Sequence, residues 1–201
     1  MNSLPFVYLA SQSPRRQQLL AQIEVPFKVL LPHDTDAAED LERVLPGETP
    51  LAYVQRVTLL KLQHAKAECK RLAWPSHPIL CADTTVALGA LIFGKPHNAE
   101  EAKDMLQRLS GQTHQVFTAI AIAHGRKTLR ALSRSKVRFD ALSARELEAY
   151  VASHEPMGKA GAYGIQGLAS GFIRSIQGSY SGIMGLPLFE TTRLLRQVAE
   201  G

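Results

Sequence analysis

Apolar and polar positions follow two different periods along this chain, and each period predicts its own kind of element. Short apolar runs predict strands over residues 6–10, 27–31, 79–82, 116–123, 131–139 and 172–176, with a further short strand near Ile183. Helical spacing and capping residues predict helices over residues 14–22, 50–74, 98–109 and 143–153, and a last helix that ends near residue 198. Strands alternate with helices early and antiparallel-looking pairs follow, so we expect an α/β fold with a mixed sheet and a binding cleft between two lobes.

Length and composition allow one domain or two small lobes, because 201 residues with 45% apolar content can bury a sizeable core. The net charge of +5 suits a small anionic ligand as well as nucleic acid. The basic residues are scattered, without a stripe of interleaved aromatics, so nucleic-acid binding is not favoured. We expect no membrane span and no signal peptide. Cys69 and Cys81 lack metal-site spacing, which predicts reduced thiols in a cytosolic protein.

The stretch Leu9-Ala-Ser-Gln-Ser-Pro-Arg-Arg16 carries the first candidate site. Ser13 is a suitable N-cap, and Pro14 suits the first helical position because its missing N–H would be unpaired there. The free N–H groups of a helix N-terminus attract anions. With Arg15 and Arg16 in the first turn, the motif suits a polyphosphate, although an ordinary strand-turn-helix with solvated arginines explains it equally well.

Asp83 follows the apolar residues 79–82, and we place it at the carboxyl end of a buried strand, where ligand sites of α/β sheets collect. Such a carboxylate can bind a divalent cation or activate a water molecule. Capping of the next turn is the structural alternative, but a carboxylate beside buried residues needs a partner, which favours function. The acidic loop that follows residue 33 is by default solvated, although one of its residues could supply a second metal ligand; its acids are Asp34, Asp36, Glu39 and Asp40.

Three lysines beside turns or on helices, Lys61, Lys95 and Lys159, are ordinary surface charges unless the fold brings them together around a triphosphate. Gln166 lies in a glycine-rich stretch, and its amide both donates and accepts, so it could pair with the O4 and N3–H edge of uracil or thymine. A backbone-bonding role for Gln166 is equally consistent. Tyr163 could stack on a base or pack in the core.

The histidine spacing indicates neither a metal site nor a catalytic triad, so zinc and serine-type hydrolysis are not expected. His114 and His124 lie in or beside apolar strands and are interpreted as structural. The remaining histidines lie near prolines or polar turns.

These motifs together resemble the Maf family, the nucleoside triphosphate pyrophosphatases once described as septum formation inhibitor proteins. The order and spacing of the matching pieces hold from about residue 7 to residue 195. The pieces are Leu9-Ala-Ser-Gln-Ser-Pro-Arg-Arg-Gln-Gln-Leu-Leu20, Ala82-Asp-Thr-Thr-Val86, Gly94-Lys-Pro96, Leu109-Ser-Gly-Gln-Thr-His114, Lys159-Ala-Gly-Ala-Tyr-Gly-Ile-Gln-Gly167, Gly178-Ser-Tyr180 and Met184-Gly-Leu-Pro187.

The resemblance implies one Maf-like domain over residues 1–201, with a mixed twisted sheet flanked by helices, and two lobes around a basic cleft like that of inosine triphosphate pyrophosphatases. It also implies a divalent cation, Mg or Mn, a cytoplasmic location and a homodimer. The implied reaction is the hydrolysis of a nucleoside triphosphate to the monophosphate and pyrophosphate. The stretch 159–167 resembles the subgroup that acts on dTTP and UTP, whereas the subgroup that acts on 7-methyl-GTP differs there.

Residue roles also follow from the resemblance. Asp83 matches the family's proton acceptor, while Arg15, Thr84 and Gln166 match the positions that set nucleotide choice. Lys61 and Lys95 match lysines of the phosphate cleft, to which our hypothesis adds Ser13 and Arg16. The family's acidic residue after the second strand aligns best with Asp36, which with Asp83 would hold the metal, and Glu39 is the substitute. Gly158 stands where the family often has aspartate.

The sequence therefore predicts a dTTP/UTP pyrophosphatase, with modified pyrimidine nucleotides left open as substrates. Two alternatives remain: a pyrophosphatase for another modified nucleotide such as 7-methyl-GTP, and a nucleotide-binding regulator of cell division without turnover. The Asp83 carboxylate favours an enzyme, because a protein that only binds nucleotides has no need of it.

Overall fold

A mixed seven-stranded sheet forms the centre of the molecule in the computed structural model, which describes residues 4–33 and 41–200. The strand order is β2-β1-β3-β5-β6-β7, and β4 pairs with β3. The β1–β2 and β1–β3 pairs are parallel and the others antiparallel, so the predicted mixed α/β sheet is confirmed. The strands are β1 (Val7–Leu9), β2 (Phe27–Val29), β3 (Ile79–Leu88), β4 (Leu91–Phe93), β5 (Thr113–His124), β6 (Lys127–Phe139) and β7 (Ile173–Gln177).

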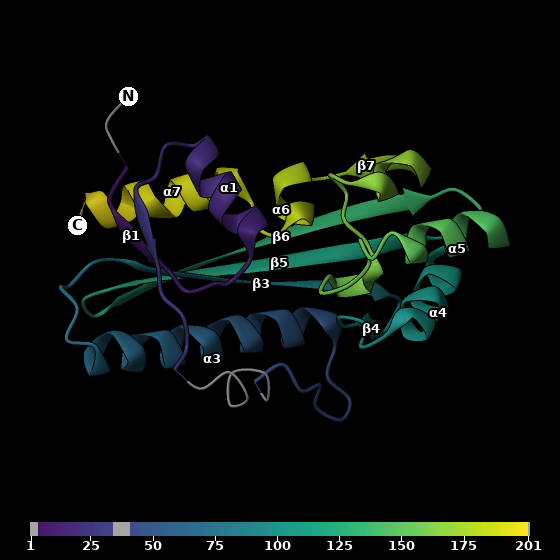
Figure 1. Cartoon of the computed structure of the whole chain (residues 1–201). Helices are drawn as coiled ribbons and strands as arrows, with labels where there is room; N and C mark the ends of the chain where they lie inside the picture. The colour runs from purple at the N-terminus through teal and green to yellow at the C-terminus, as the bar shows by residue number, and fades with distance from the viewer. Residues whose placement is uncertain (1–3, 34–40, 201) are drawn as a thin grey trace.

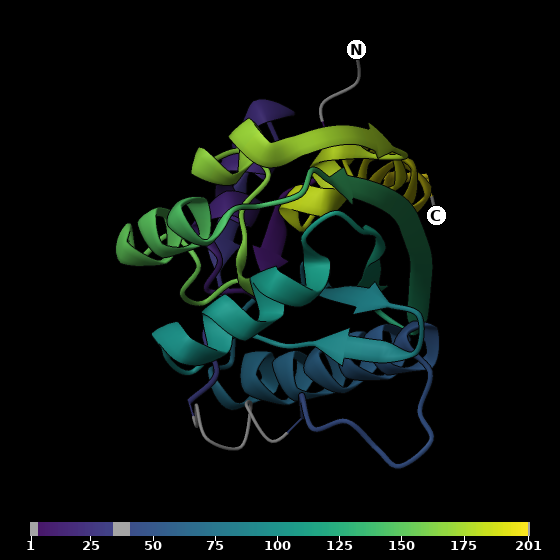
Figure 2. The ribbon, with the colours of Figure 1, turned by 90° about the vertical axis from the view of Figure 1, so that its right-hand side faces the viewer.

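Helices cover both faces of the sheet. The long helix α3 lies on one face, and three shorter helices lie on the other (Figure 1). Two further helices, α4 and α5, cover one end of the sheet (Figure 2). No helix in the described part of the chain is long and apolar enough to cross a membrane. The helices are α1 (Pro14–Gln22), α3 (Pro50–Arg71), α4 (Ala99–Leu109), α5 (Ala144–Ala152), α6 (Tyr180–Met184) and α7 (Leu188–Ala199), with short 3₁₀ helices η1 (Ala160–Ala162) and η2 (Leu168–Phe172).

Local capping residues begin the helices where the sequence predicts. Thr49 accepts a hydrogen bond from the Ala52 N–H at the start of α3, and Asn98 accepts one from the Glu101 N–H at the start of α4. Ser143 and its partner three residues on form a complete capping box at α5. Pro14 opens α1 as expected, but the side chain of Ser13 makes no capping bond.

The predicted short strand near Ile183 is wrong, because this segment is helix α6. The Ser179 hydroxyl accepts from the Gly182 N–H and caps the first turn. Gly185, with φ of 120°, ends the helix in a conformation that other residues rarely adopt. The Ser179 cap and the terminal Gly185 thus make the apolar pair Ile183 and Met184 part of a helical turn.

Strand β3 is longer than the apolar run 79–82, so Asp83 lies within the strand and not at its end. Along one edge β3 pairs with β5 from Ile79 to Ala87. Along the other edge it pairs with β1 only at residues 79–80 and with β4 only at residues 86–88. Among the strands of the described chain, none pairs with this second edge over residues 81–85, and Asp83 lies at the middle of that open stretch.

Candidate functional site

A cavity of about 500 Å³ lies along the open stretch of β3. Its walls come from the start of α1, the loop after β2, helix α3, strand β3, the turn after β4, the loop around η1 and helix α6. These segments are far apart in the sequence, and the sheet brings them together. The cavity contains more positive than negative side chains: its cations are Arg15, Arg16, Lys61, Lys95 and Lys159, and its carboxylates are Glu42, Glu68 and Asp83.

The structure brings the predicted site residues of the described chain to this one cavity. The group that lines it comprises Ser13, Arg15, Arg16, Lys61, Asp83, Thr84, Lys95 and Gln166. Asp36 and its substitute Glu39 lie outside the described residues. The convergence of cations that the sequence leaves open is therefore present, although their individual roles remain predictions.

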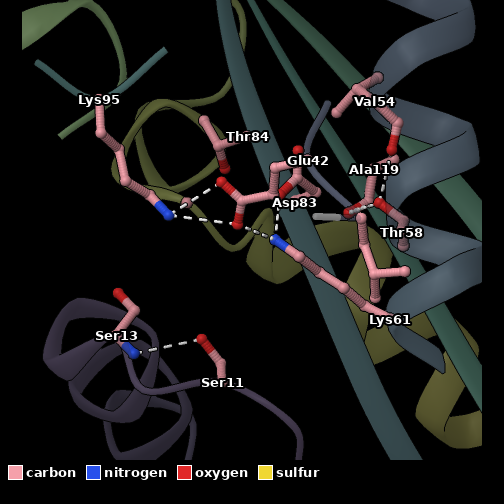
Figure 3. Close-up of polar contacts among 12 residues, drawn as sticks. Ser11, Ser13, Glu42, Val54, Thr58, Lys61, Asp83, Thr84, Lys95 and Ala119 are labelled. Carbon is pink, nitrogen blue, oxygen red and sulfur yellow. Dashed lines mark hydrogen bonds and ion pairs between the residues drawn. The ribbon is translucent and has the colours of Figure 1, made fainter. Parts of the chain in front are cut away.

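Two lysines and two carboxylates form a cluster on the α3 face of β3, and we call it the lysine–carboxylate cluster: Glu42, Lys61, Asp83 and Lys95. The Lys61 Nζ donates to Asp83 Oδ1 and to Glu42 Oε1, both at 2.7 Å (Figure 3). The Lys95 Nζ lies 3.0 Å from Glu42 Oε2. Asp83 is buried, with 7% of its surface exposed. One ammonium thus joins the two carboxylates that the cavity offers beside the open edge.

The charges of this cluster shift each other's pKa values. Burial would raise the pKa of Glu42, but the Lys61 and Lys95 ammonium groups outweigh it and lower that pKa. Burial would lower the pKa of Lys61, but Asp83 and Glu42 outweigh it and raise that pKa. The lowered pKa of Glu42 and the raised pKa of Lys61 therefore keep these two partners charged around neutral pH.

Glu42 is the residue that our reading of the sequence missed. The acidic run that attracts attention ends at Asp40, and a loop has no periodicity to show which carboxylate faces inward. The structure adds a backbone anchor, because Tyr53 Oη donates to the Glu42 carbonyl at 2.8 Å. The only available signal was an acidic residue next to the apolar Leu41, shortly after the acidic run.

On the opposite face of β3, Arg16 forms the centre of a second set of contacts, which we call the arginine network. Its guanidinium donates to the Gly185 carbonyl at 2.7 Å, to Ser11 Oγ at 3.0 Å and to Thr84 Oγ1 at 3.3 Å. The Thr84 hydroxyl is also 3.0 Å from that of Thr118, which faces it on β5. Successive side chains of a strand point to opposite faces, which explains why Asp83 and Thr84 serve different networks.

The two remaining cations of the cavity, Arg15 and Lys159, lie close to each other beside the η1 loop. Burial lowers the pKa of Arg15. Burial and the charge of Arg15 lower the pKa of Lys159, whose ammonium donates to the Glu155 carbonyl oxygen. A pair of neighbouring cations facing a cavity favours an anionic ligand, because such a ligand relieves their repulsion.

Gln166 is exposed on the loop between η1 and η2, where it follows the buried Ile165 and precedes Gly167. This residue borders the cavity. Tyr163 lines the same region but is only 6% exposed, and its hydroxyl lies 2.8 Å from His114 Nε2. His114 is fully buried against Phe139, with ring centroids 4.8 Å apart. The interpretation of His114 as a structural residue agrees with this position.

The cavity offers a divalent cation two carboxylate ligands, and the other ligands must come from water and substrate. Among the described residues no group of three histidine, cysteine or carboxylate side chains could hold a metal ion. Asp83 and Glu42 instead offer two carboxylates, and Mg²⁺ is commonly bound by one or two carboxylates together with water and substrate phosphates. The residues present therefore fit a cation that completes its coordination with ligand oxygens.

Several known proteins resemble this chain over nearly its full length. The chain is 56% identical to the dTTP/UTP pyrophosphatase of Albidiferax ferrireducens over 95% of this chain and 96% of that protein. It is also 56% identical to the dTTP/UTP pyrophosphatases of a Polaromonas species, over 98% and 97% of the two chains, and of Cupriavidus pinatubonensis, over 96% of each. The Ham1 protein of Staphylococcus aureus superposes with a TM-score of 0.42 at 14% identity, covering 67% of this chain and 71% of that one.

The family of Maf-like proteins matches residues 6–198, which include every residue of the cavity. Identity above 50% extends over nearly the full length of both chains in each of these pyrophosphatases. This protein is therefore a member of the Maf family.

Proposed function

We propose that this chain hydrolyses dTTP and UTP to the nucleoside monophosphate and pyrophosphate. The observation that carries the proposal is the convergence of five cations and the Asp83 carboxylate on one cavity. A triphosphate needs several cations to offset its charge, and hydrolysis needs a carboxylate beside them. The three relatives named above, at 56% identity, carry the same activity in their names.

The triphosphate tail would lie between the start of α1 and the lysine–carboxylate cluster. Arg16 and Ser13 come from the first of these, and Lys61 and Lys95 from the second. The free N–H groups at the N-terminus of α1 add partial positive charge near these arginines. Arginine can bind two phosphate oxygens at once, whereas each lysine acts as a point charge.

Asp83 would act as the proton acceptor. It takes a proton from a water molecule while the water oxygen bonds to the α-phosphorus. The bond between the α-phosphorus and the bridging oxygen breaks, and pyrophosphate leaves with that oxygen. Lys61 Nζ, at 2.7 Å from Oδ1, holds the Asp83 side chain in position for this transfer.

A divalent cation, Mg²⁺ or Mn²⁺, belongs to the proposal and would offset charge on the phosphate oxygens. Asp83 and Glu42 are the described residues that would hold it, together with Asp36, which the resemblance assigns to the metal and which lies outside the described residues.

Base selection would use Arg15, Thr84 and Gln166. The Gln166 amide can donate to O4 and accept from N3–H of uracil or thymine, and cytosine presents the reverse pattern. The Thr84 hydroxyl is engaged by Arg16 and Thr118, so it would contribute through the position of Arg16. A homodimer of single-domain chains in the cytoplasm completes the proposal, and the two free cysteines, Cys69 and Cys81, support a reducing compartment.

The test is a panel of dTTP, UTP, CTP, GTP, dATP and 7-methyl-GTP, with and without Mg²⁺, in which pyrophosphate and phosphate are measured separately. We expect pyrophosphate mainly from dTTP and UTP, with CTP as a poor substrate, and only with the cation present. A preference for 7-methyl-GTP would replace the proposed substrate. Tight nucleotide binding without release of pyrophosphate would refute the enzyme.

A further inference from the structure

We propose that Glu155 is a positioning residue for base recognition, and this inference rests on the proposed function. Glu155 follows α5 in the chain, is half-buried and does not line the cavity. Its carboxylate holds the loop that carries Gln166. Without it the Gln166 amide has no fixed orientation, and the site loses its discrimination between uracil and cytosine.

The contacts of Glu155 join three parts of the molecule. Its Oε2 accepts from the Leu168 N–H at 2.8 Å, and its Oε1 accepts from the Ala169 N–H at 3.4 Å. Tyr150 Oη donates to Oε1 at 2.9 Å. A negatively charged acceptor forms stronger bonds to backbone N–H groups than a neutral one, so the carboxylate is well suited to hold this segment.

Leu168 and Ala169, which donate these two N–H groups, are the first residues of η2. This helix begins two residues after Gln166. N–H groups at the start of a helix lack partners within the helix, so a side chain must satisfy them. The Gly167 N–H also bonds to the Gly164 carbonyl at 3.0 Å, which closes a turn that contains Gln166. Gln166 thus lies between two fixed points, and one of them is set by Glu155.

Gly167 shows how closely the loop and the carboxylate fit. A Cβ atom at this position would overlap the Glu155 carboxylate oxygens. The backbone of Gly167 has φ of −106°, which any residue can adopt. A side chain at this position would therefore displace the Glu155 carboxylate, although the backbone itself would accept it.

Tyr150 ties the carboxylate to the core. It is 5% exposed, and its ring centroid lies 5.2 Å from that of Phe172 at the end of η2. The same hydroxyl that donates to Glu155 also accepts from the Gly164 N–H at 3.4 Å. The carboxylate, the tyrosine and both ends of the 164–168 turn therefore form one connected unit.

The test compares Glu155→Gln with wild type in kcat and KM for UTP and CTP. The amide keeps the size of the side chain but presents a donor or a weaker acceptor to the Leu168 N–H. We expect the UTP-to-CTP ratio of kcat/KM to fall by roughly tenfold, mainly through KM for UTP. Glu148→Gln, on α5 and paired with Lys103 outside the cavity, is the matched control and leaves the ratio unchanged.

A double-mutant cycle separates positioning from general loss of stability. Gly167→Ala alone displaces the carboxylate and reduces selectivity, as Glu155→Ala does. In the Glu155→Ala background the obstacle is absent, so adding Gly167→Ala has no further effect. Two independent losses that add would overturn the proposal.

Hydrogen exchange keeps this inference distinct from the proposed function. Glu155→Gln speeds amide exchange at residues 168 and 169, whether or not the protein hydrolyses any nucleotide. If wild type releases no pyrophosphate, the function is wrong, and this exchange measurement still decides the role of Glu155 in the loop. Unchanged exchange together with unchanged selectivity would overturn the inference.

Discussion

Lys61 and Arg16 are both cations of the same cavity, but they lie on opposite faces of β3 and have opposite partners. Lys61 has two carboxylates within 2.7 Å, and its pKa is raised despite burial. Arg16 donates only to neutral oxygens among the described residues, and burial lowers its pKa. A guanidinium still keeps its proton at neutral pH, because its ordinary pKa is above 12.

The difference separates two uses of a buried charge. The charge of Lys61 is offset within the protein, so this lysine holds the carboxylates in place. Among the described residues no carboxylate bonds directly to Arg16, so its charge is available for an anionic ligand. The lysine–carboxylate cluster therefore combines the proposed proton acceptor with phosphate contacts, whereas the arginine network is suited to binding alone.

The largest effect is expected from Asp83→Asn, which removes the proton acceptor but keeps an oxygen for Lys61. We expect kcat to fall by about 10²–10⁴-fold, with the fold intact. Glu68→Gln is the control, because Glu68 also lines the cavity but bonds to Arg71. Equal losses in the two variants, measured as pyrophosphate release, would remove the distinction between the cluster and the rest of the cavity.

His114 is a third buried basic side chain, and unlike Lys61 and Arg16 it loses its proton when it is buried. Burial lowers the pKa of His114 to about 4, while the unfolded chain takes the proton near 6.5. The free energy of unfolding should therefore fall by about 3 kcal/mol as the pH drops from 6.5 to 4. His114→Gln should flatten urea-measured stability across this window, and parallel curves for the two proteins would contradict it.

Lys61→Met tests whether the lysine stabilises the two carboxylates. We expect the free energy of unfolding to fall by about 2 kcal/mol at neutral pH, because two partly buried carboxylates lose their common partner. Lys95→Met, at an exposed lysine, should cost less than about 1 kcal/mol.

The same substitution has a pH signature. The lowered pKa of Glu42 stabilises the fold above its ordinary value of 4.5, and this stability is lost as the pH falls through the lowered pKa. The raised pKa of Lys61 stabilises the fold below 10.5, and that stability is lost as the pH rises through the raised pKa. The difference between wild type and Lys61→Met should therefore be greatest between these limits, and a difference independent of pH would speak against the ion pairs.

The smallest effect is expected from Arg16→Lys. The ammonium keeps the charge but cannot serve all the acceptors that the guanidinium fork reaches. We expect KM for UTP to rise by about tenfold with little change in kcat. Arg126→Lys, at an exposed position in the β5–β6 turn, is the matched control. A loss in kcat alone would place Arg16 in the chemistry instead of in binding.

Local signals in the sequence predicted what depends on local structure. The caps of α3, α4 and α5 are set by residues three positions apart, so the sequence alone places these helices. The length of β3 was underestimated because Asp83 interrupts the apolar run, although the two threonines that follow favour a strand.

Contacts between distant residues could not be predicted from pattern alone. Glu42 meets Lys61 and Lys95 across 19 and 53 residues, and no periodic signal marks its loop. The resemblance to the Maf family named the cavity residues, but the pairing of these residues with one another came only from the fold.

The open edge of β3 also bears on the solubility of this protein. An unpaired strand edge is a template for another chain, which proteins usually cover, shorten or charge. Here β1 and β4 flank a gap of residues 81–85, which spans about 16 Å at the usual rise of a strand. The gap is short and carries a carboxylate at its middle, so an invading strand would find few backbone partners and a buried charge. The short, charged gap that leaves the site open to a small ligand is thus a poor template for a strand of another chain, which disfavours aggregation.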